Sequence, residues 1–199
     1  MGLLVFAAHC DDGELWAGGV ITKLVEAGSH VVLAVANHDP TRRKEAKAGA
    51  GILGCDVWFR PEGLDLVKWV SECLQQARPE VLMTHPHYDP HFEHRELSNA
   101  VSCGLTKSRD RKLYPERWYW FDTYYSTQCE GSPLLMDISG QFDKKIAALK
   151  RHRSQTPESL ADMAQTMNAL HGRRIRAEYA EAFYAFPLLG RWPRLRDSP

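Results

Sequence analysis

Short apolar runs and longer amphipathic segments alternate regularly along the first half of the chain. The short runs are rich in β-branched residues and predict strands, whereas the longer segments carry apolar residues at helical spacing. The predicted strands cover residues 3–8, 30–35, 55–59 and 81–84, and the predicted helices cover residues 14–27, 41–53, 64–77 and 95–103. This order favours parallel strands joined by right-handed helical crossovers.

The hydrophobic pattern becomes less regular after residue 104. Residues 117–125 carry six aromatic side chains in nine positions, and their alternation predicts a strand. Such an aromatic run is more often part of a core than a stacking platform for sugars. Residues 133–139 predict a further strand, residues 142–151 an amphipathic helix, and residues 158–186 a long helix.

These elements together predict the fold class. A chain of 199 residues is long enough for one α/β domain with a substantial core. We expect one domain over residues 1–199, in which residues 1–104 form a Rossmann-like core and residues 105–199 form a C-terminal αβ extension. The expected architecture is a Rossmann-like three-layer sandwich with a mostly parallel sheet.

Composition and charge narrow the classes of partner. Lys plus Arg and Asp plus Glu number 25 each, which favours neither nucleic acid nor an anionic membrane. The five cysteines are widely spaced and lack a Cys-x-x-Cys pair, as is typical of a reducing compartment. No apolar run approaches the roughly 18 residues of a membrane span, and no signal peptide is recognisable. We expect a cytoplasmic protein that acts on a small molecule; a homo-oligomer is compatible with the sequence, which does not specify the oligomeric state.

The first predicted strand leads directly into a charged turn that holds His9, Asp11 and Asp12. In an open α/β sheet, ligands bind at this end of the strands. His9 and Asp12 are three residues apart and can converge on one point, and zinc accepts both ligand types. Asp11 lies between them, where a general base is needed. The alternative is that the carboxylates only cap the following helix and that His9 is a hydrogen-bonded residue at the strand end.

A second polar cluster follows the predicted strand 81–84. Residues 85–94 contain four of the nine histidines of the chain. A solvated surface loop would also accommodate them, but both clusters follow predicted strands of one sheet. A single metal site shared by the two loops explains this pattern better.

Two motifs now point to a family. Residues 9–19 read His-Cys-Asp-Asp-Gly-Glu-Leu-Trp-Ala-Gly-Gly. They resemble the His-Pro-Asp-Asp-x-Glu-Leu-Gly-x-Gly-Gly motif of the PIG-L/LmbE-like family of zinc-dependent N-deacetylases. Residues 89–95 read Asp-Pro-His-Phe-Glu-His-Arg and resemble the Asp-x-His-x-Asp-His-Arg motif of that family. Residues 42–54 and 147–155 carry weaker matches, the second of which includes a His-x-Ser-Gln segment.

The resemblance assigns roles by position in these motifs. It implies that His9, Asp12 and His94 bind one zinc ion per chain. It further implies that Asp11 is the general base and that His91 stabilises the oxyanion. Each of these residues stands where the family has the same residue type.

Other positions either support the motifs or depart from them. Asp89 and Glu93 are expected to hold the histidines of the second motif by hydrogen bonds. Glu93 stands where the family has Asp, and Cys10 stands where it has Pro, which adds a soft metal ligand to the turn. Trp16 replaces a glycine and is expected to place a large ring near the mouth of the site.

Several residues are candidates for contact with a substrate. Arg42 and Arg43 begin a predicted helix, where they could meet a phosphate or hydroxyl group, although a basic helix face is more often only solvated. His38 follows the second predicted strand and is equally well explained as a polar loop residue. The remaining candidates are the aromatic residues Trp16 and Tyr124.

The function implied by the resemblance is zinc-dependent hydrolysis. The substrate would be an N-acetylglucosamine-type amino sugar on a larger conjugate, in glycoside or secondary-metabolite biosynthesis, and the reaction would remove its N-acetyl group. Two alternatives stay open. One is a metal-dependent amidase that acts on a non-sugar conjugate. The other is a non-catalytic doubly wound binding module, although the chain lacks a Gly-x-Gly-x-x-Gly turn after the first strand.

Overall fold

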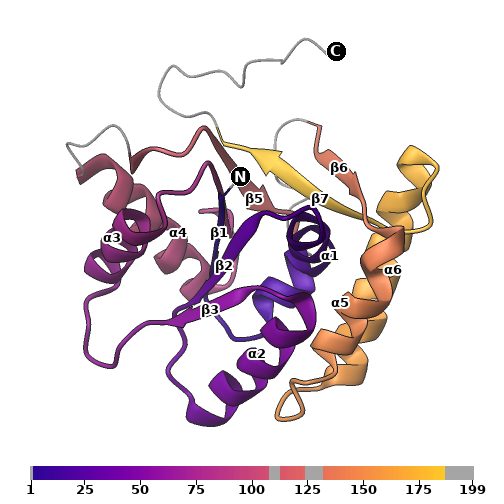
Figure 1. Cartoon of the computed structure of the whole chain (residues 1–199), viewed down its shortest axis with the longest axis horizontal. Helices are drawn as coiled ribbons and strands as arrows, with labels where there is room; N and C mark the ends of the chain where they lie inside the picture. The colour runs from indigo at the N-terminus through magenta and orange to yellow at the C-terminus, as the bar shows by residue number, and fades with distance from the viewer. Residues whose placement is uncertain (1, 108–112, 124–131, 187–199) are drawn as a thin grey trace.

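The computed structural model describes residues 2–107, 113–123 and 132–186. Strands and helices alternate through the first half of the chain, as the sequence predicts, and Figure 1 shows their arrangement. The elements are β1 (Gly2–Ala7), α1 (Asp12–Glu26), β2 (His30–Val35), α2 (Pro40–Leu53), β3 (Asp56–Phe59), α3 (Leu66–Ala77), β4 (Val81–Thr84), α4 (Phe92–Lys107), β5 (Arg117–Phe121), β6 (Leu134–Asp137), η3 (Ser139–Gln141), α5 (Phe142–Leu149), α6 (Pro157–Ile175) and β7 (Ala180–Ala185).

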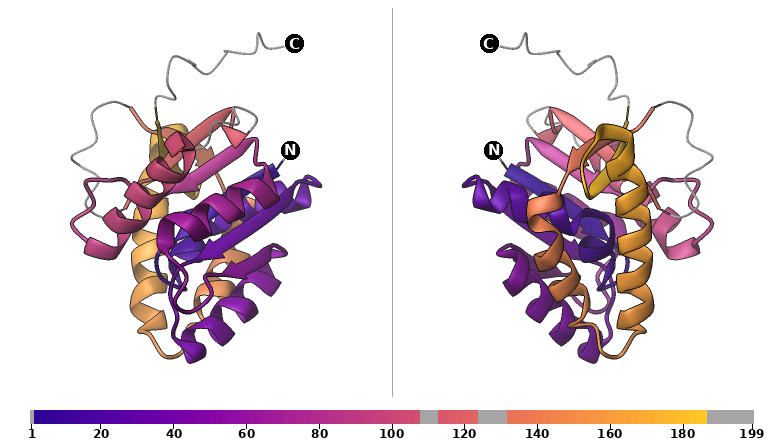
Figure 2. Two further views of the ribbon diagram at one scale, coloured as in Figure 1. Left: turned by 90° about the vertical axis from the view of Figure 1, so that its left-hand side faces the viewer. Right: turned by 90° about the vertical axis from the view of Figure 1, so that its right-hand side faces the viewer.

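The seven strands form one sheet in the order β3-β2-β1-β4-β5-β7-β6. Strands β1 to β5 are parallel to one another, whereas β7 runs antiparallel to both β5 and β6. Helices α3 and α4 cover one face, and α1, α2, α5 and α6 cover the other, as the two side views show (Figure 2). The predicted single-domain, three-layer α/β fold with a mostly parallel sheet is confirmed.

The sheet brings the two polar clusters of the sequence together. β1 pairs in parallel with β4, and Val5 lies opposite Met83. Both strands therefore end at the same edge, β1 at Ala7 and β4 at Thr84. Because neighbouring strands are about 4.8 Å apart, the loops that follow them must lie side by side.

The long helix predicted for residues 158–186 is wrong in its second half. Helix α6 ends at Ile175, Arg176 adopts a left-handed conformation with φ of 61°, and the chain turns back as β7. At Gly172 the returning backbone passes so close that a Cβ atom would lie 2.6 Å from the carbonyl oxygen of Glu178. The Ala- and Glu-rich sequence of β7 favours a helix locally, but burial between β5 and β6 makes it a strand.

A buried ion pair fastens the C-terminal elements to α1. Glu181 of β7 accepts hydrogen bonds from the backbone N–H groups of Gly19 (2.9 Å) and Val20 (2.8 Å) and from Lys145 Nζ of α5 (2.7 Å). Gly19 also lets Ile138 pack against the helix, since a Cβ atom there would lie 2.6 Å from that side chain. The double glycine of the first motif therefore serves close packing.

No helix in the described part of the chain combines the length and the apolarity that crossing a membrane requires.

Candidate metal centre

Three side chains from two distant loops converge at the shared end of β1 and β4. His9 Nδ1 lies 3.1 Å from His94 Nε2 and 3.3 Å from a carboxylate oxygen of Asp12. His94 Nε2 lies 3.5 Å from the other oxygen of Asp12. Asp12 and His94 are buried, whereas His9 is partly exposed to solvent.

The spacing of these donor atoms suits a metal ion. Zinc bonds of about 2.0–2.1 Å at tetrahedral angles place two donor atoms about 3.3 Å apart. His9 Nδ1 and His94 Nε2 are 3.1 Å apart, and they lie 3.3 and 3.5 Å from different oxygens of the Asp12 carboxylate. Two imidazole nitrogens and a carboxylate are a donor set that zinc accepts, and three protein ligands leave a position open for a reactant.

Backbone and carboxylate contacts hold this arrangement in place. The N–H of His9 donates to Asp12 across the tight turn (2.6 Å). Asp89 is buried, and its carboxylate lies 3.1 Å from His94 Nδ1, which directs the opposite nitrogen, Nε2, towards Asp12. The same carboxylate accepts from the N–H of His91 (2.8 Å) and from Thr123 Oγ1 (3.0 Å). Helix α4 begins at Phe92, earlier than predicted, so His94 lies in its first turn.

The electrostatics of the centre favour a positive charge. Burial alone would raise the pKa of Asp12, but the imidazoles of His85 and His94 hold it well below its usual range. Burial alone would lower the pKa of His94, but the carboxylates of Asp12 and Asp89 raise it to about 10. The space between these groups therefore attracts a cation, either a proton or a metal ion.

Asp11 lies beside the three converging residues. Burial, together with the negative charge of Asp12, raises the pKa of Asp11. The guanidinium group of Arg42 approaches to 3.9 Å and acts in the opposite direction. A buried carboxylate with a raised pKa is suited to accept a proton near neutral pH.

His91 and Glu93 form the more exposed side of the centre. The side chain of His91 is 41% exposed, and its Nδ1 lies 3.1 Å from Glu93 Oε2. The same oxygen of Glu93 lies 3.3 Å from His9 Nε2. The longer side chain of Glu93, compared with Asp, thus reaches histidines of both loops.

Sequence reasoning assigned no role to His85, which the structure places inside the cluster. His85 is fully buried, its Nε2 lies 3.2 Å from Asp12, and its ring stacks on that of His94 at 3.7 Å. Two overlapping groups of potential metal ligands result, one of His9, His91 and His94 and one of Asp12, His85 and His94. Burial lowers the pKa of His85 to about 4, which keeps the ring neutral. Its position directly after β4 was the signal that could have identified it.

A second feature that the sequence did not predict is a pair of buried side chains behind the acidic turn. Glu14 and His152 are both fully buried, and His152 Nε2 lies 3.2 Å from Glu14 Oε1. Gly49 leaves room for Glu14, since a Cβ atom there would lie 2.2 Å from the carboxylate. Ser154 donates from both its N–H and its hydroxyl group to Glu45 of α2. The His-x-Ser-Gln segment of the sequence therefore contacts both α1 and α2.

The candidate substrate contacts lie in different environments. Arg42 donates to Gln155 and faces Asp11. Arg43 and His38 contact each other on the neighbouring part of the same edge, with Arg43 Nη2 3.0 Å from His38 Nδ1. Tyr124 lies outside the described residues.

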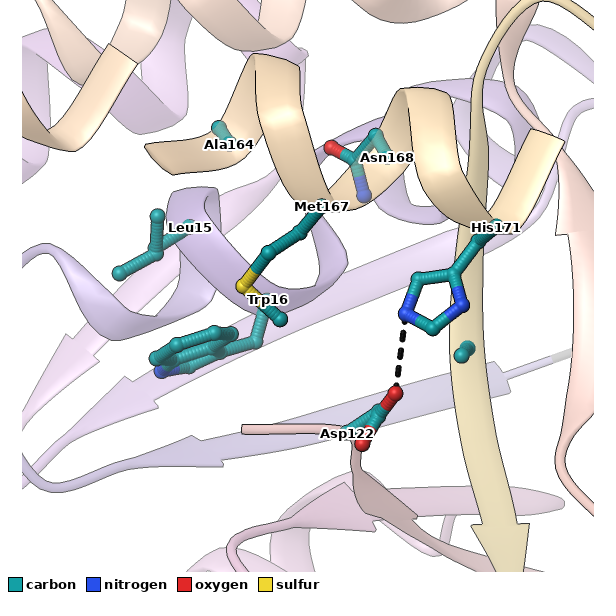
Figure 3. Close-up of a pocket in the computed structure, with 8 residues that line it drawn as sticks. Leu15, Trp16, Asp122, Ala164, Met167, Asn168 and His171 are labelled. Atoms are coloured by element: carbon teal, nitrogen blue, oxygen red, sulfur yellow. Dashed lines mark ion pairs between the residues drawn. The ribbon is translucent and has the colours of Figure 1, made fainter. Parts of the chain in front are cut away.

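Trp16 is buried rather than exposed beside the acidic turn. Its ring lies between α1 and α6 in a small pocket (Figure 3), and the residue is only 5% exposed. His171 and Asp122 form an ion pair of 2.9 Å in the same pocket. The pocket is lined by Leu15, Trp16, Asp122, Ala164, Met167, Asn168, His171 and Ala182. Contact between Trp16 and a substrate stays a prediction.

Cys10 belongs to neither group of potential metal ligands in the described part of the chain. The side chain is fully buried, and burial raises the pKa of the thiol to about 12. Its Sγ lies 3.8 Å from Asn37 Oδ1, on the side of the neighbouring strand β2.

The chain matches the model of one protein family, a group of metal-dependent N-deacetylases with an α/β fold. The profile of the PIG-L family, described as GlcNAc-PI de-N-acetylase, matches residues 4–103. The chain belongs to this family.

Named relatives agree with this assignment. The chain is 25% identical to the diacetylchitobiose deacetylase of Thermococcus kodakarensis, over 93% of this chain and 83% of that protein. It is 26% identical to the probable N-acetyl-alpha-D-glucosaminyl L-malate deacetylase 2 of Bacillus cereus, over 80% of this chain and 86% of that protein.

One solved structure shows how far the fold extends beyond deacetylases. The 4-carboxy-2-hydroxymuconate hydratase GalB of Pseudomonas putida KT2440 superposes with a TM-score of 0.77 at 23% identity, covering 94% of this chain and 97% of that chain. Because this likeness concerns the fold alone, the reaction of the present chain must be inferred from its own site.

Proposed function

We propose that this protein is a zinc-dependent hydrolase that removes the N-acetyl group from an N-acetylglucosamine-type amino sugar on a larger conjugate. The observation that carries the proposal is the convergence of His9, Asp12 and His94 at 3.1–3.5 Å beside a buried carboxylate, Asp11. Relatives named as deacetylases of amino sugars support the choice of substrate.

His9, Asp12 and His94 would hold the zinc ion, with Asp89 fixing the ring of His94 through its Nδ1. A zinc ion at this position supplies Lewis acidity, which polarises an amide carbonyl and makes water easier to deprotonate. The remaining steps belong to side chains of the chain itself.

Asp11 would act first as base and then as acid. It accepts a proton from water while the water oxygen bonds to the carbonyl carbon of the acetamide. When the C–N bond breaks, Asp11 returns that proton to the departing nitrogen, so the products are a free amine and acetic acid, which then ionises to acetate. Its raised pKa suits both transfers, because the group must gain and lose the proton near neutral pH.

His91 would stabilise the negative charge that develops on the carbonyl oxygen. It would donate through Nε2 to the oxyanion, while its Nδ1 faces Glu93 Oε2 at 3.1 Å. Burial and the imidazoles of His94 and His9 lower the pKa of the ring, and the carboxylate of Glu93 acts in the opposite direction to favour its protonated form. The exposure of His91 lets a substrate reach it. A donor of this kind typically contributes about 3 kcal/mol to stabilising the transition state.

The test is acetate release by the purified chain from a panel of N-acetylglucosaminides, with bound zinc measured in the same preparation. We expect about one zinc per chain and acetate release that the Asp11→Asn variant loses while it keeps its zinc. Release from N-acetylated non-sugar amines instead would favour the amidase. A zinc-loaded chain that releases no acetate from either set would overturn the proposal.

A further inference from the structure

Two arginines and a histidine form a second polar cluster on the sheet edge, outside the candidate metal centre. Arg43 lies in the first turn of α2, His38 follows β2, and Arg60 directly follows β3. Arg60 points its Nε and Nη2 at His38 Nε2, at 2.9 and 2.6 Å, and Arg43 Nη2 lies 3.0 Å from His38 Nδ1. We call these three residues the arginine cluster.

The arginine cluster has more hydrogen-bond donors than acceptors. A neutral imidazole carries one acceptor nitrogen and one N–H, whereas guanidinium groups only donate. Both ring nitrogens of His38 nevertheless face a guanidinium group. Whichever ring nitrogen carries the proton, one guanidinium N–H meets another N–H. Protonating His38 would make this mismatch worse, and burial together with Arg60 and Arg43 lowers the pKa of the ring.

The positive charge of the cluster is fixed in place and not neutralised by a carboxylate. Arg43 donates from Nε to the carbonyl oxygen of Asn37 (2.8 Å) and from Nη2 to that of Arg60, and its guanidinium lies 5.1 Å from the ring centre of Phe59. Neither arginine forms an ion pair with a carboxylate of the described residues. Glu62 is exposed and acts on His38 only through its field.

The cluster lies next to the metal centre along the same edge. β2 neighbours β1, and β3 neighbours β2. Neighbouring strands are about 4.8 Å apart. The ends of β2 and β3, which precede His38 and Arg60, therefore lie roughly 5 and 10 Å from the end of β1 along the edge. Asn37 links the two regions, because its side-chain oxygen lies 3.8 Å from Cys10 Sγ and accepts from the N–H of Asp39. A conjugate whose acetamide is held at the metal centre can therefore extend over the arginine cluster.

We propose that Arg43, Arg60 and His38 bind an oxyanion, a carboxylate or a phosphate, on the part of the substrate beyond the amino sugar. An oxyanion accepts several N–H groups at once and removes the excess of donors, and guanidinium groups match its geometry in bidentate fashion. This inference rests on the proposed function and narrows its substrate class to anionic amino-sugar conjugates.

The kinetic test compares three N-acetylglucosaminides that differ only in the aglycone: a neutral methyl group, a carboxyalkyl group and a phosphodiester. We expect kcat/KM to be about 10-fold or more higher for at least one anionic substrate than for the neutral one. The Arg60→Met variant should reduce that ratio to about one, and Arg60→Lys should leave an intermediate ratio. Lys44→Met removes a charge from the exposed side of the same helix and should leave the ratio unchanged.

The two anionic substrates distinguish a carboxylate from a phosphate, and a preference for either supports the inference. Equal kcat/KM for neutral and anionic substrates, or an unchanged preference in Arg60→Met, would overturn it. Calorimetric titration with methyl phosphate gives a readout that does not need deacetylation. The zinc-loaded parent should bind it about 10-fold more tightly than Arg60→Met, and equal affinities would overturn the inference even if no acetate is released.

Discussion

The candidate metal centre and the arginine cluster lie on one edge of one sheet, yet their charges are opposite. At the ends of β1 and β4, Asp12 and Asp89 surround His94 and raise its pKa to about 10, so this position attracts a cation. At the ends of β2 and β3, burial and the guanidinium groups of Arg60 and Arg43 lower the pKa of His38. A parallel sheet supplies equivalent positions at each strand end, and the side chains placed there decide the sign of the ion that binds.

The largest effect should follow from removing a metal ligand. In the His94→Ala variant, bound zinc should fall from about one per chain to near zero and acetate release should fall to background, a larger loss than the 10- to 100-fold typical of residues that only support ligands. His87→Ala is a matched control, because His87 is exposed in the same loop. Zinc measured by atomic absorption decides the outcome, and a zinc-loaded His94→Ala protein would remove this residue from the metal site.

The next largest effect should separate chemistry from metal binding. Asp11→Asn keeps the size of the side chain but cannot accept the proton, so kcat should fall about 100- to 10,000-fold while zinc content stays the same. Steady-state rates and metal analysis on one preparation test this. Loss of zinc together with activity would instead make Asp11 a part of the metal site.

Salt should act on only one of the two regions. Raising ionic strength from about 0.05 to 0.5 M shortens the screening length and should reduce the preference for anionic substrates by weakening the partly exposed arginine cluster. The rate with the neutral substrate should change much less, because its reaction depends on the buried centre. Equal salt sensitivity for neutral and anionic substrates would contradict the separation of the two regions.

The smallest effect concerns pH. Burial and Asp12 raise the pKa of Asp11, so the rate should rise with pH through a value above that of an ordinary aspartate, as the base loses its proton. The charge of Arg42 lowers this pKa, and the Arg42→Met variant should therefore move the acid limb of the kcat/KM profile to higher pH. Lys44→Met should leave the limb where it is. An acid limb that moves to lower pH in Arg42→Met would contradict the role of Asp11 as the base.

The sequence predicted the first half of the fold and the meeting of His9, Asp12 and His94 because both follow from local patterns. Apolar runs and amphipathic segments define strands and helices one at a time, and parallel pairing then places successive strand ends on one edge. Assigning roles to individual residues required the family motifs in addition.

The features of the fold and the site that were not predicted depend on contacts between segments far apart in the sequence. Such contacts leave no pattern in the local sequence. The pairing of Glu14 with His152 joins positions far apart in the sequence, and the strand character of β7 comes from its neighbours rather than from its own composition. Arg60 carries no local signal of a cluster, since its partners are His38 in the loop after β2 and Arg43 in the first turn of α2. Tertiary packing decides such features, and no spacing rule identifies them.

The hydrogen bonds that Glu181 accepts from α1 and from Lys145 have a consequence for protein engineering. The helix whose first residue is Asp12 is held at its middle by a carboxylate from the last described strand, and that carboxylate also accepts a hydrogen bond from an ammonium group of α5. A fragment cut after α4 would keep every residue assigned to the zinc ion but lose the anchor of the helix that presents one of them. Grafting this chemistry onto another scaffold would therefore require transplanting the C-terminal elements as well.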